Sequence, residues 1–174
     1  MTTCLITGAG GFVGSALART LMAAGTFGRL LLTDRAPKPD WCPPDGARVV
    51  WQPGELHDPA LLDALFSGRI DRVAHLAGVV SGAAEADFDL GWRVNVDATR
   101  ALLARSVAQG RSGPPIRFVF ASSIAVHGVP LPAAIDDHTP ASPSLSYGVQ
   151  KLINELLIAE LSRRGWLDGI SLRL

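Results

Sequence analysis

The sequence has 174 residues, enough for one domain with a sizeable buried core. Hydrophobic residues make up 48% of it and charged residues 18%, a balance that excludes an intrinsically disordered chain. Because 16 basic residues balance 16 acidic ones, bulk charge gives no reason to expect a nucleic-acid or anionic membrane partner. The four histidines are scattered without a metal-ligand spacing, so we expect no metal site.

Two cysteines are too few for a disulfide framework. Cys4 falls in an apolar run and is expected to be buried, whereas Cys42 falls in a proline-rich loop and is expected to be exposed. The N-terminus leads directly into a predicted strand, without a basic leader or a long apolar segment. We therefore expect a soluble, cytoplasmic protein.

Short apolar runs alternate with segments of helical periodicity along the whole chain. We expect strands at residues 3–7, 30–32, 49–51, 73–76, 116–120 and 170–174. We expect helices at 13–24, 58–66, 87–109 and 146–164, with a loop over 122–143. This alternation predicts an α/β fold, a doubly wound parallel sheet with helices on both faces. No linker or repeat divides the chain, so residues 1–174 are expected to form one domain.

A glycine-rich segment joins the first strand to the first helix. Its glycines at 8, 11 and 14 have the spacing GxxGxxG, a variant of the dinucleotide fingerprint GxGxxG. Glycines here permit a tight turn, close approach of the backbone to a pyrophosphate, and close packing of helix on strand. The helix N-terminus offers free N–H groups to phosphate. An ordinary glycine turn is the alternative, but the strand before and the helix after favour a Rossmann dinucleotide site.

Asp34 follows Gly14 by 20 residues and ends the second predicted strand. A carboxylate at this position can accept hydrogen bonds from both ribose hydroxyls of adenosine and would repel a 2′-phosphate. The pattern therefore predicts NAD as the cofactor in preference to NADP. NADP stays as the alternative cofactor because of Arg35, since an arginine at this point can bind a 2′-phosphate.

Tyr147 and Lys151 are spaced i, i+4 near the start of a predicted helix, so both lie on one helix face. A nearby ammonium favours the tyrosinate, which would let the phenol act as acid or base nearer neutral pH. Ser122 and Ser123 follow the fifth strand at the carboxyl edge of the sheet, where open α/β sheets bind ligands. These residues form a candidate catalytic set.

With these motifs the chain resembles the extended short-chain dehydrogenase/reductase family, also called the NAD-dependent epimerase/dehydratase family. The resemblance covers the whole chain and rests on five motifs in the family's order: Thr7 to Gly14, His75-Leu76-Ala77-Gly78, Asn95-Val96, Ser122-Ser123, and Tyr147-Gly148-Val149-Gln150-Lys151. The family's usual final alanine is Gly78 here, and a tyrosine often found four residues after the serine is His127. The His127 departure weakens the case for a nucleotide-sugar substrate.

The resemblance implies a role for each matching residue. Tyr147 would be the general base, Lys151 would hold the nicotinamide ribose and lower the tyrosine pKa, and Ser123, with Ser122 as the alternative, would bind the reacting oxygen. Asn95 would lie near the active site as a catalytic residue. The cofactor would contact Gly8, Gly11, Phe12, Val13, Gly14, Asp34, Glu55, Leu56, Ala77, Gly78, Asn95, Tyr147 and Lys151.

Within the family, residues 79–92, 123–132 and 162–166 resemble D-erythronate dehydrogenases, which oxidise a small sugar acid. Ser81 and Gly82 would then face the substrate together with Ser123. The resemblance implies an NAD-dependent oxidoreductase acting on a secondary hydroxyl. A nucleotide-sugar epimerase or dehydratase with bound NAD is the alternative, and a non-catalytic dinucleotide-binding module is a third reading.

Two expectations concern assembly and extent. The 146–164 helix is apolar most of the way round, which favours a homodimer built on this helix and the long one before it. Family members continue past this region for about another domain of ~100–200 residues, which supplies most of the substrate pocket. We therefore expect these 174 residues to lack the C-terminal substrate domain, to bind cofactor and to turn over slowly or not at all.

Overall fold

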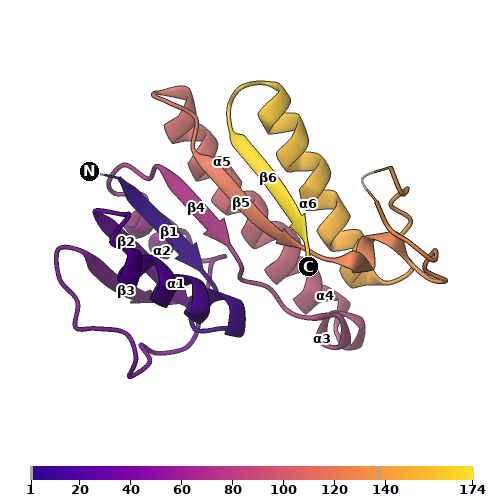
Figure 1. Ribbon diagram of the computed structural model, residues 1–174, viewed down its shortest axis with the longest axis horizontal. Helices are drawn as coiled ribbons and strands as arrows, with labels where there is room; N and C mark the ends of the chain where they lie inside the picture. The colour runs from indigo at the N-terminus through magenta and orange to yellow at the C-terminus, as the bar shows by residue number, and fades with distance from the viewer. Residues whose placement is uncertain (1, 137) are drawn as a thin grey trace.

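The computed structural model describes residues 2–136 and 138–174 (Figure 1). Its strands are β1 (Thr3–Thr7), β2 (Arg29–Asp34), β3 (Val49–Pro53), β4 (Arg72–His75), β5 (Arg117–Ser122) and β6 (Asp168–Arg173). They form one sheet in the order β3-β2-β1-β4-β5-β6, and every neighbouring pair is parallel. The predicted Rossmann fold is confirmed. The strand order reverses between β1 and β4, which is the switch point where such sheets bind ligands.

The helices follow the predicted order with two differences. They are α1 (Phe12–Ala24), α2 (Pro59–Leu65), α3 (Ser81–Ala86), α4 (Phe88–Gly91), η1 (Trp92–Asp97), α5 (Ala98–Arg111), η2 (Ile124–His127) and α6 (Ser146–Arg163). The predicted 87–109 helix is a continuous run of α4, η1 and α5, in which η1 is a π-helix. The short 3₁₀ turn η2 lies within the segment 122–143 that was predicted to be a loop. The short helix α3 was not predicted, because six small or polar residues carry no helical apolar period.

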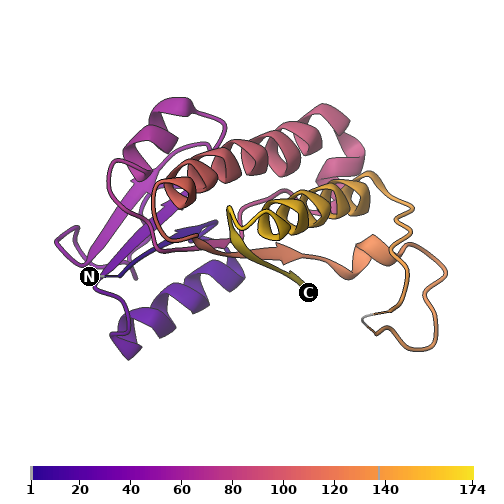
Figure 2. The ribbon, with the colours of Figure 1, turned by 90° about the horizontal axis from the view of Figure 1, so that it is seen from above.

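Two hydrophobic cores lie on opposite faces of the sheet, because successive strand residues point to opposite sides. Leu5 and Leu31 join the core under α2, α5 and α6, whereas Ile6 and Leu32 join the core under α1. Figure 2 shows α1 on one side of the sheet and α2, α5 and α6 on the opposite side. Helices therefore cover both faces, as predicted.

On the α1 side of the sheet, helices cover only some of the strands. Helix α1 contacts β1 and β2, and among the described residues no helix packs on that face of β5 and β6 (Figure 2). Ile170 and Leu172 on β6 are accordingly 46% and 44% exposed.

Cys42 is buried, at 5% exposure, and the prediction that it is exposed was wrong. The proline-rich loop after β2 folds back, so that Cys42 joins the α1-side core together with Trp51. Trp41 packs edge-on against Trp51 with ring centroids 6.3 Å apart, and the Arg19 guanidinium lies 5.1 Å from the Trp41 ring. These long-range aromatic contacts order the loop, and composition alone does not indicate them.

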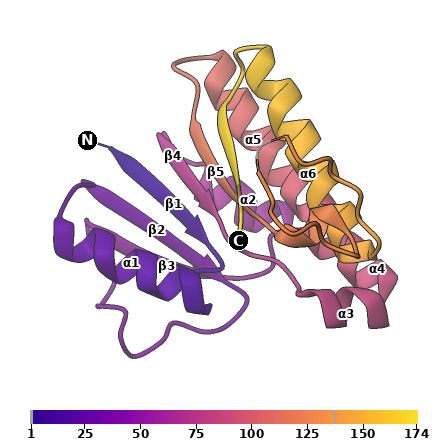
Figure 3. The ribbon, with the colours of Figure 1, turned by 45° about the vertical axis from the view of Figure 1, so that its right-hand side comes forward.

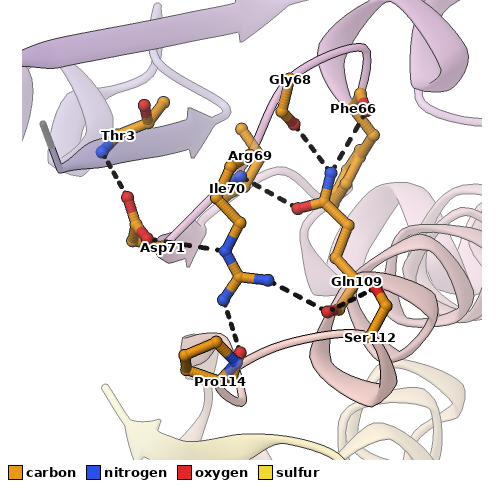
Figure 4. Close-up of polar contacts among 9 residues, drawn as sticks. All are labelled: Thr3, Phe66, Gly68, Arg69, Ile70, Asp71, Gln109, Ser112 and Pro114. Atoms are coloured by element: carbon orange, nitrogen blue, oxygen red, sulfur yellow. Dashed lines mark hydrogen bonds and ion pairs between the residues drawn. The ribbon is translucent and has the colours of Figure 1, made fainter.

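The amino end of the sheet is tied together by Gln109 near the end of α5 (Figure 4). Its amide donates to the carbonyls of Phe66 and Gly68 and accepts from the Ile70 N–H at 2.9 Å. Arg69 donates to the Gln109 carbonyl at 3.0 Å. These bonds satisfy backbone groups of two loops at the end of the sheet opposite the glycine segment, so this cluster is structural.

Candidate functional site

The glycine segment turns from β1 into α1 as the fingerprint predicts. Gly8 has φ +68°, and a Cβ there would lie 2.7 Å from the Ala77 nitrogen. A Cβ on buried Gly14 would lie 2.0 Å from the Gly8 carbonyl oxygen, so the start of the helix packs directly on the turn. Only glycine allows this approach of backbone to backbone.

The first turn of α1 is open to a ligand. Its N-cap, Gly11, has no side-chain cap, and Phe12 and Val13 are 93% and 44% exposed. The free N–H groups and the positive end of the helix dipole therefore face outward, as a phosphate site requires. Phe12 and Val13 are not among the residues that line the adjacent cavity, and their predicted contact with the cofactor stays a prediction.

Asp34 ends β2 beside this turn. Its carboxylate accepts hydrogen bonds from the backbone N–H groups of Gly10 and Ala36, both at 3.0 Å. These bonds hold the side chain at the carboxyl edge of the sheet, where it lines the same cavity as Gly8 and Gly11. Arg35 also lines this cavity. The structure thus brings the predicted ribose carboxylate to the glycine turn.

A cavity of about 560 Å³ occupies the switch point. Among the predicted cofactor residues, it is lined by Gly8, Gly11, Asp34, Glu55, Leu56, Ala77 and Gly78. Leu56 is buried and Glu55 exposed, so the pair presents an apolar wall with a carboxylate at its rim. The backbone cradle, the ribose carboxylate and the apolar wall together fit an extended dinucleotide such as NAD.

Ala77 and Gly78 follow β4 and connect the cavity to the candidate catalytic residues. A Cβ on Gly78 would lie 3.0 Å from the Asn95 amide oxygen and 3.7 Å from the Lys151 ammonium. The departure from the family's alanine therefore gives room to two polar side chains.

Asn95 lies in the π-helix η1 and is buried. Its amide accepts from the Val79 N–H at 2.9 Å and donates to the Val79 carbonyl at 3.1 Å and to the Gln150 side chain at 2.8 Å. Both ends of the Asn95 amide are thus hydrogen-bonded within the protein, and these bonds hold the loop after β4 against α6. This geometry is that of a positioning residue, whereas the sequence predicted a catalytic contact.

Ser123, Tyr147 and Lys151 come together where β5 and α6 meet. The Ser123 side chain lies close enough to Tyr147 to lower the pKa of the phenol, and the Lys151 ammonium lies 5.5 Å from the Tyr147 ring centroid. Lys151 is buried and donates to the Ala121 carbonyl at 2.7 Å. The i, i+4 spacing therefore brings the two α6 side chains to one place, as predicted.

The electrostatics differ from the expectation for Tyr147. Burial raises the pKa of the phenol, and the nearby Ser123 side chain opposes that rise. Burial also lowers the pKa of the Lys151 ammonium, to about 8. The ammonium points to the Ala121 carbonyl, so it does not lower the tyrosine pKa in this arrangement.

Ser122 points away from this set. It is buried, and its hydroxyl donates to the Glu155 carboxylate, which also pairs with Arg173 at 2.8 Å. The Arg173 guanidinium lies 3.3 Å from the His127 ring, so this departure from the family's tyrosine belongs to the same network. Of the two serines, Ser123 is therefore the one at Tyr147.

Ser81 and Gly82 begin α3, which packs near α6. The Glu85 side chain of α3 accepts a hydrogen bond from the Ser146 N–H, directly before Tyr147. Ser81 is half-buried and Gly82 exposed, and their predicted contact with substrate stays a prediction.

His75 is fully buried and bonds through Nδ1 to Thr7 at 2.7 Å and through Nε2 to Thr99 at 2.8 Å. Burial lowers its pKa to about 3, so it stays neutral and structural. In the described part of the chain, no group of three or more His, Cys, Asp or Glu side chains could hold a metal ion. None of the described helices combines the length and apolar character that a membrane span needs.

Comparison with known proteins agrees with this geometry. D-erythronate dehydrogenase from Cupriavidus necator is 48% identical over 176 residues, covering 98% of this chain and 53% of that protein. The Haemophilus influenzae D-erythronate dehydrogenase is 41% identical, again covering 98% and 53%. The crystal structure of a nucleoside-diphosphate-sugar epimerase from Agrobacterium tumefaciens is also similar, with a TM-score of 0.89 and 40% sequence identity. The match covers 99% of this chain and 52% of the epimerase chain.

The chain spans about half the length of the curated relatives that it matches. The sequence profile of the NAD dependent epimerase/dehydratase family matches residues 4–174, nearly the whole chain. The chain therefore belongs to the NAD-dependent epimerase/dehydratase family.

Proposed function

We propose that this chain is the cofactor-binding and catalytic part of an NAD-dependent oxidoreductase. The substrate is a small sugar acid such as D-erythronate, oxidised at a secondary hydroxyl. The observation that carries the proposal is that Ser123, Tyr147 and Lys151 come together where β5 and α6 meet, with the Lys151 ammonium 5.5 Å from the Tyr147 ring and close to Gly78 of the dinucleotide cavity. The relatives named D-erythronate dehydrogenase support this choice of substrate.

In this proposal some residues bind the cofactor and others transfer the proton of the substrate hydroxyl. Gly8, Gly11 and the first turn of α1 would hold the pyrophosphate, and Asp34 the adenosine ribose. When bound, NAD supplies the nicotinamide ring that accepts hydride. Lys151, at the Gly78 end of the cavity, would hold the nicotinamide ribose.

The proton of the substrate hydroxyl would pass to the Tyr147 oxygen, with Ser123 holding the same substrate oxygen by a hydrogen bond. Because burial raises the pKa of Tyr147, formation of the tyrosinate needs a positive charge nearby. Lys151, with a pKa of about 8, remains mostly protonated at neutral pH and can supply it. A move of its ammonium from the Ala121 carbonyl toward the phenol would stabilise the tyrosinate.

The experiment that tests this function measures NADH formation. The protein that carries these residues is incubated with NAD and D-erythronate, and absorbance at the NADH band is followed. Net NADH supports the proposal. Turnover of a nucleotide sugar without net NADH would instead favour the epimerase reading, which the likeness to a nucleoside-diphosphate-sugar epimerase suggests. NAD binding without turnover of either substrate would favour a non-catalytic module.

We predict that the protein binds NAD more tightly than NADP. The Asp34 carboxylate, held by Gly10 and Ala36, lies where a 2′-phosphate would meet it. Calorimetric titration with both cofactors checks the preference. Asp34→Ala is expected to reduce the ratio of NAD affinity to NADP affinity by about tenfold or more. Tighter binding of NADP by the unaltered protein would contradict the prediction and give Arg35 the deciding role.

We also propose a homodimer built on α5 and α6. Leu156 on α6 is 63% exposed and Val149, two turns earlier, is 39% exposed, whereas Ile158 faces the core. Leu156→Glu should weaken the dimer by at least tenfold, since it would bury a charge in an apolar interface. Sedimentation at micromolar concentration measures this, with Thr20→Glu on exposed α1 as control. A monomer before any substitution would exclude the dimer.

A further inference from the structure

One face of the continuous helix α4–η1–α5 forms a wall of the dinucleotide cavity. Leu90, Arg93, Val94 and Ala98 line it at helical spacing. Three of these four side chains are apolar, as expected for a wall that packs against a cofactor. Arg93 is the exception, and it lies in the π-helical segment, a type of bulge that is frequent at functional sites.

Arg93 makes no hydrogen bond or ion pair with any residue in 2–136 or 138–174. Its neighbours along the same helix are paired: Arg100 lies 3.9 Å from Asp97, and Arg105 lies 2.6 Å from Asp63. The Arg93 guanidinium is exposed and borders a concave site. Such a group can take an anionic ligand without first breaking a protein ion pair.

The cavity needs a positive charge for its ligand. A dinucleotide brings two phosphate charges, yet the segment from Gly8 to Gly14 contains no lysine or arginine and supplies only backbone N–H groups. Two cationic side chains, Arg35 and Arg93, line the cavity in the described structure. Arg35 adjoins Asp34 at the adenosine ribose, which leaves Arg93 for the pyrophosphate.

We propose that Arg93 binds the cofactor pyrophosphate as a charge-assisted, bidentate ion pair, opposite the N-terminus of α1. This role rests on the proposed function of the cavity as an NAD site. A carboxylate of the substrate is the other anion to consider. Ser123 and Tyr147 do not line the cavity that Arg93 borders, so the geometry favours the cofactor phosphate over the substrate. Figure 3 shows α4 beyond the carboxyl end of β4, at the same edge of the sheet as the turn from β1 into α1.

The test titrates Arg93→Gln and Arg93→Lys with NAD, ADP and adenosine. We expect Arg93→Gln to bind NAD and ADP at least tenfold more weakly and adenosine unchanged, because only the first two carry a pyrophosphate. Arg93→Lys keeps the positive charge but not the planar guanidinium that can bind a phosphate with two hydrogen bonds. Its affinity for NAD and ADP should therefore fall less than that of Arg93→Gln. The salt dependence of ADP binding should also decrease in Arg93→Gln. Arg100→Gln is the matched control, and its affinities for NAD and ADP should equal those of the unaltered protein.

Since Arg93 makes no hydrogen bond or ion pair with the described residues, both variants should keep the thermal unfolding midpoint of the unaltered protein. Equal affinity of Arg93→Gln and the unaltered protein for NAD and ADP would overturn the proposal. A raised KM for the substrate at unchanged dinucleotide affinity would also overturn it and assign Arg93 to the substrate carboxylate. Failure of the unaltered protein to bind NAD would refute the proposed function itself, and with it this role.

Discussion

Tyr147→Phe is expected to lower kcat by roughly 10²–10⁴-fold, the range for loss of a positioned acid or base. NAD affinity should stay within about twofold, because the phenol ring is kept and Tyr147 does not line the dinucleotide cavity. Lys151→Ala should lower both kcat and NAD affinity, since its ammonium lies between Gly78 at the cofactor cavity and the Tyr147 ring. Steady-state rates and NAD titrations of both variants separate these effects.

Val149→Ala on the same helix is the control, because its side chain is 39% exposed and lies outside the catalytic set. The measurement needs a protein that turns over, since these residues span about half of their curated relatives. Rates for Tyr147→Phe like those of the unaltered enzyme would remove Tyr147 as the base. An equal loss in Tyr147→Phe and Val149→Ala would indicate damage to α6 instead.

Features set by local backbone geometry could be predicted from the sequence. The glycine turn, the carboxylate at the end of β2, and the shared face of Tyr147 and Lys151 all follow from short spacings. Their positions in the structure agree with the predictions because strands and helices have fixed periods. The parallel sheet followed from the alternation of apolar runs in the same way.

Features that depend on distant pairing could not be predicted. Asn95 and Gln150 are 55 residues apart, and only folding shows that the Asn95 amide is occupied by Gln150 and Val79. The choice between Ser122 and Ser123 depended on Glu155, which lies on α6 and bonds to Ser122. Arg93 stands two residues before Asn95, yet its place on the cavity wall depends on how the helix docks. No local pattern indicates such contacts.

The Asn95 contacts explain how these distant parts act together. By bonding to both backbone groups of Val79, Asn95 fixes the loop that runs from Ala77 past the cofactor cavity. By donating to Gln150, it fixes the same loop relative to the residue directly before Lys151. The cavity and the proposed catalytic residues are therefore held in fixed relative positions, as the proposed hydride transfer over a short distance would require.

Gly14→Ala is expected to be the most damaging single change in the glycine turn. The added Cβ would lie 2.0 Å from the Gly8 carbonyl oxygen and 2.9 Å from the Ala9 Cα, and backbone atoms cannot move aside cheaply. Overpacking of this kind costs about 1–3 kcal/mol, which lowers the unfolding midpoint by roughly 2–12 °C. The forced shift of α1 from the turn should also weaken NAD binding by about 100-fold, since the helix N-terminus and the turn bind the same phosphates.

A graded series makes the prediction specific to the turn. Gly46→Ala is the control, because a Cβ there meets nothing within 4 Å, and it should change neither the unfolding midpoint nor NAD affinity. Gly10→Ala should have an intermediate effect, since its Cβ would press on the Asp34 carboxylate at 3.2 Å. Differential scanning fluorimetry and NAD titration measure the three variants side by side. If Gly14→Ala binds NAD as tightly as Gly46→Ala does, close packing of α1 on the turn is not what shapes the phosphate site.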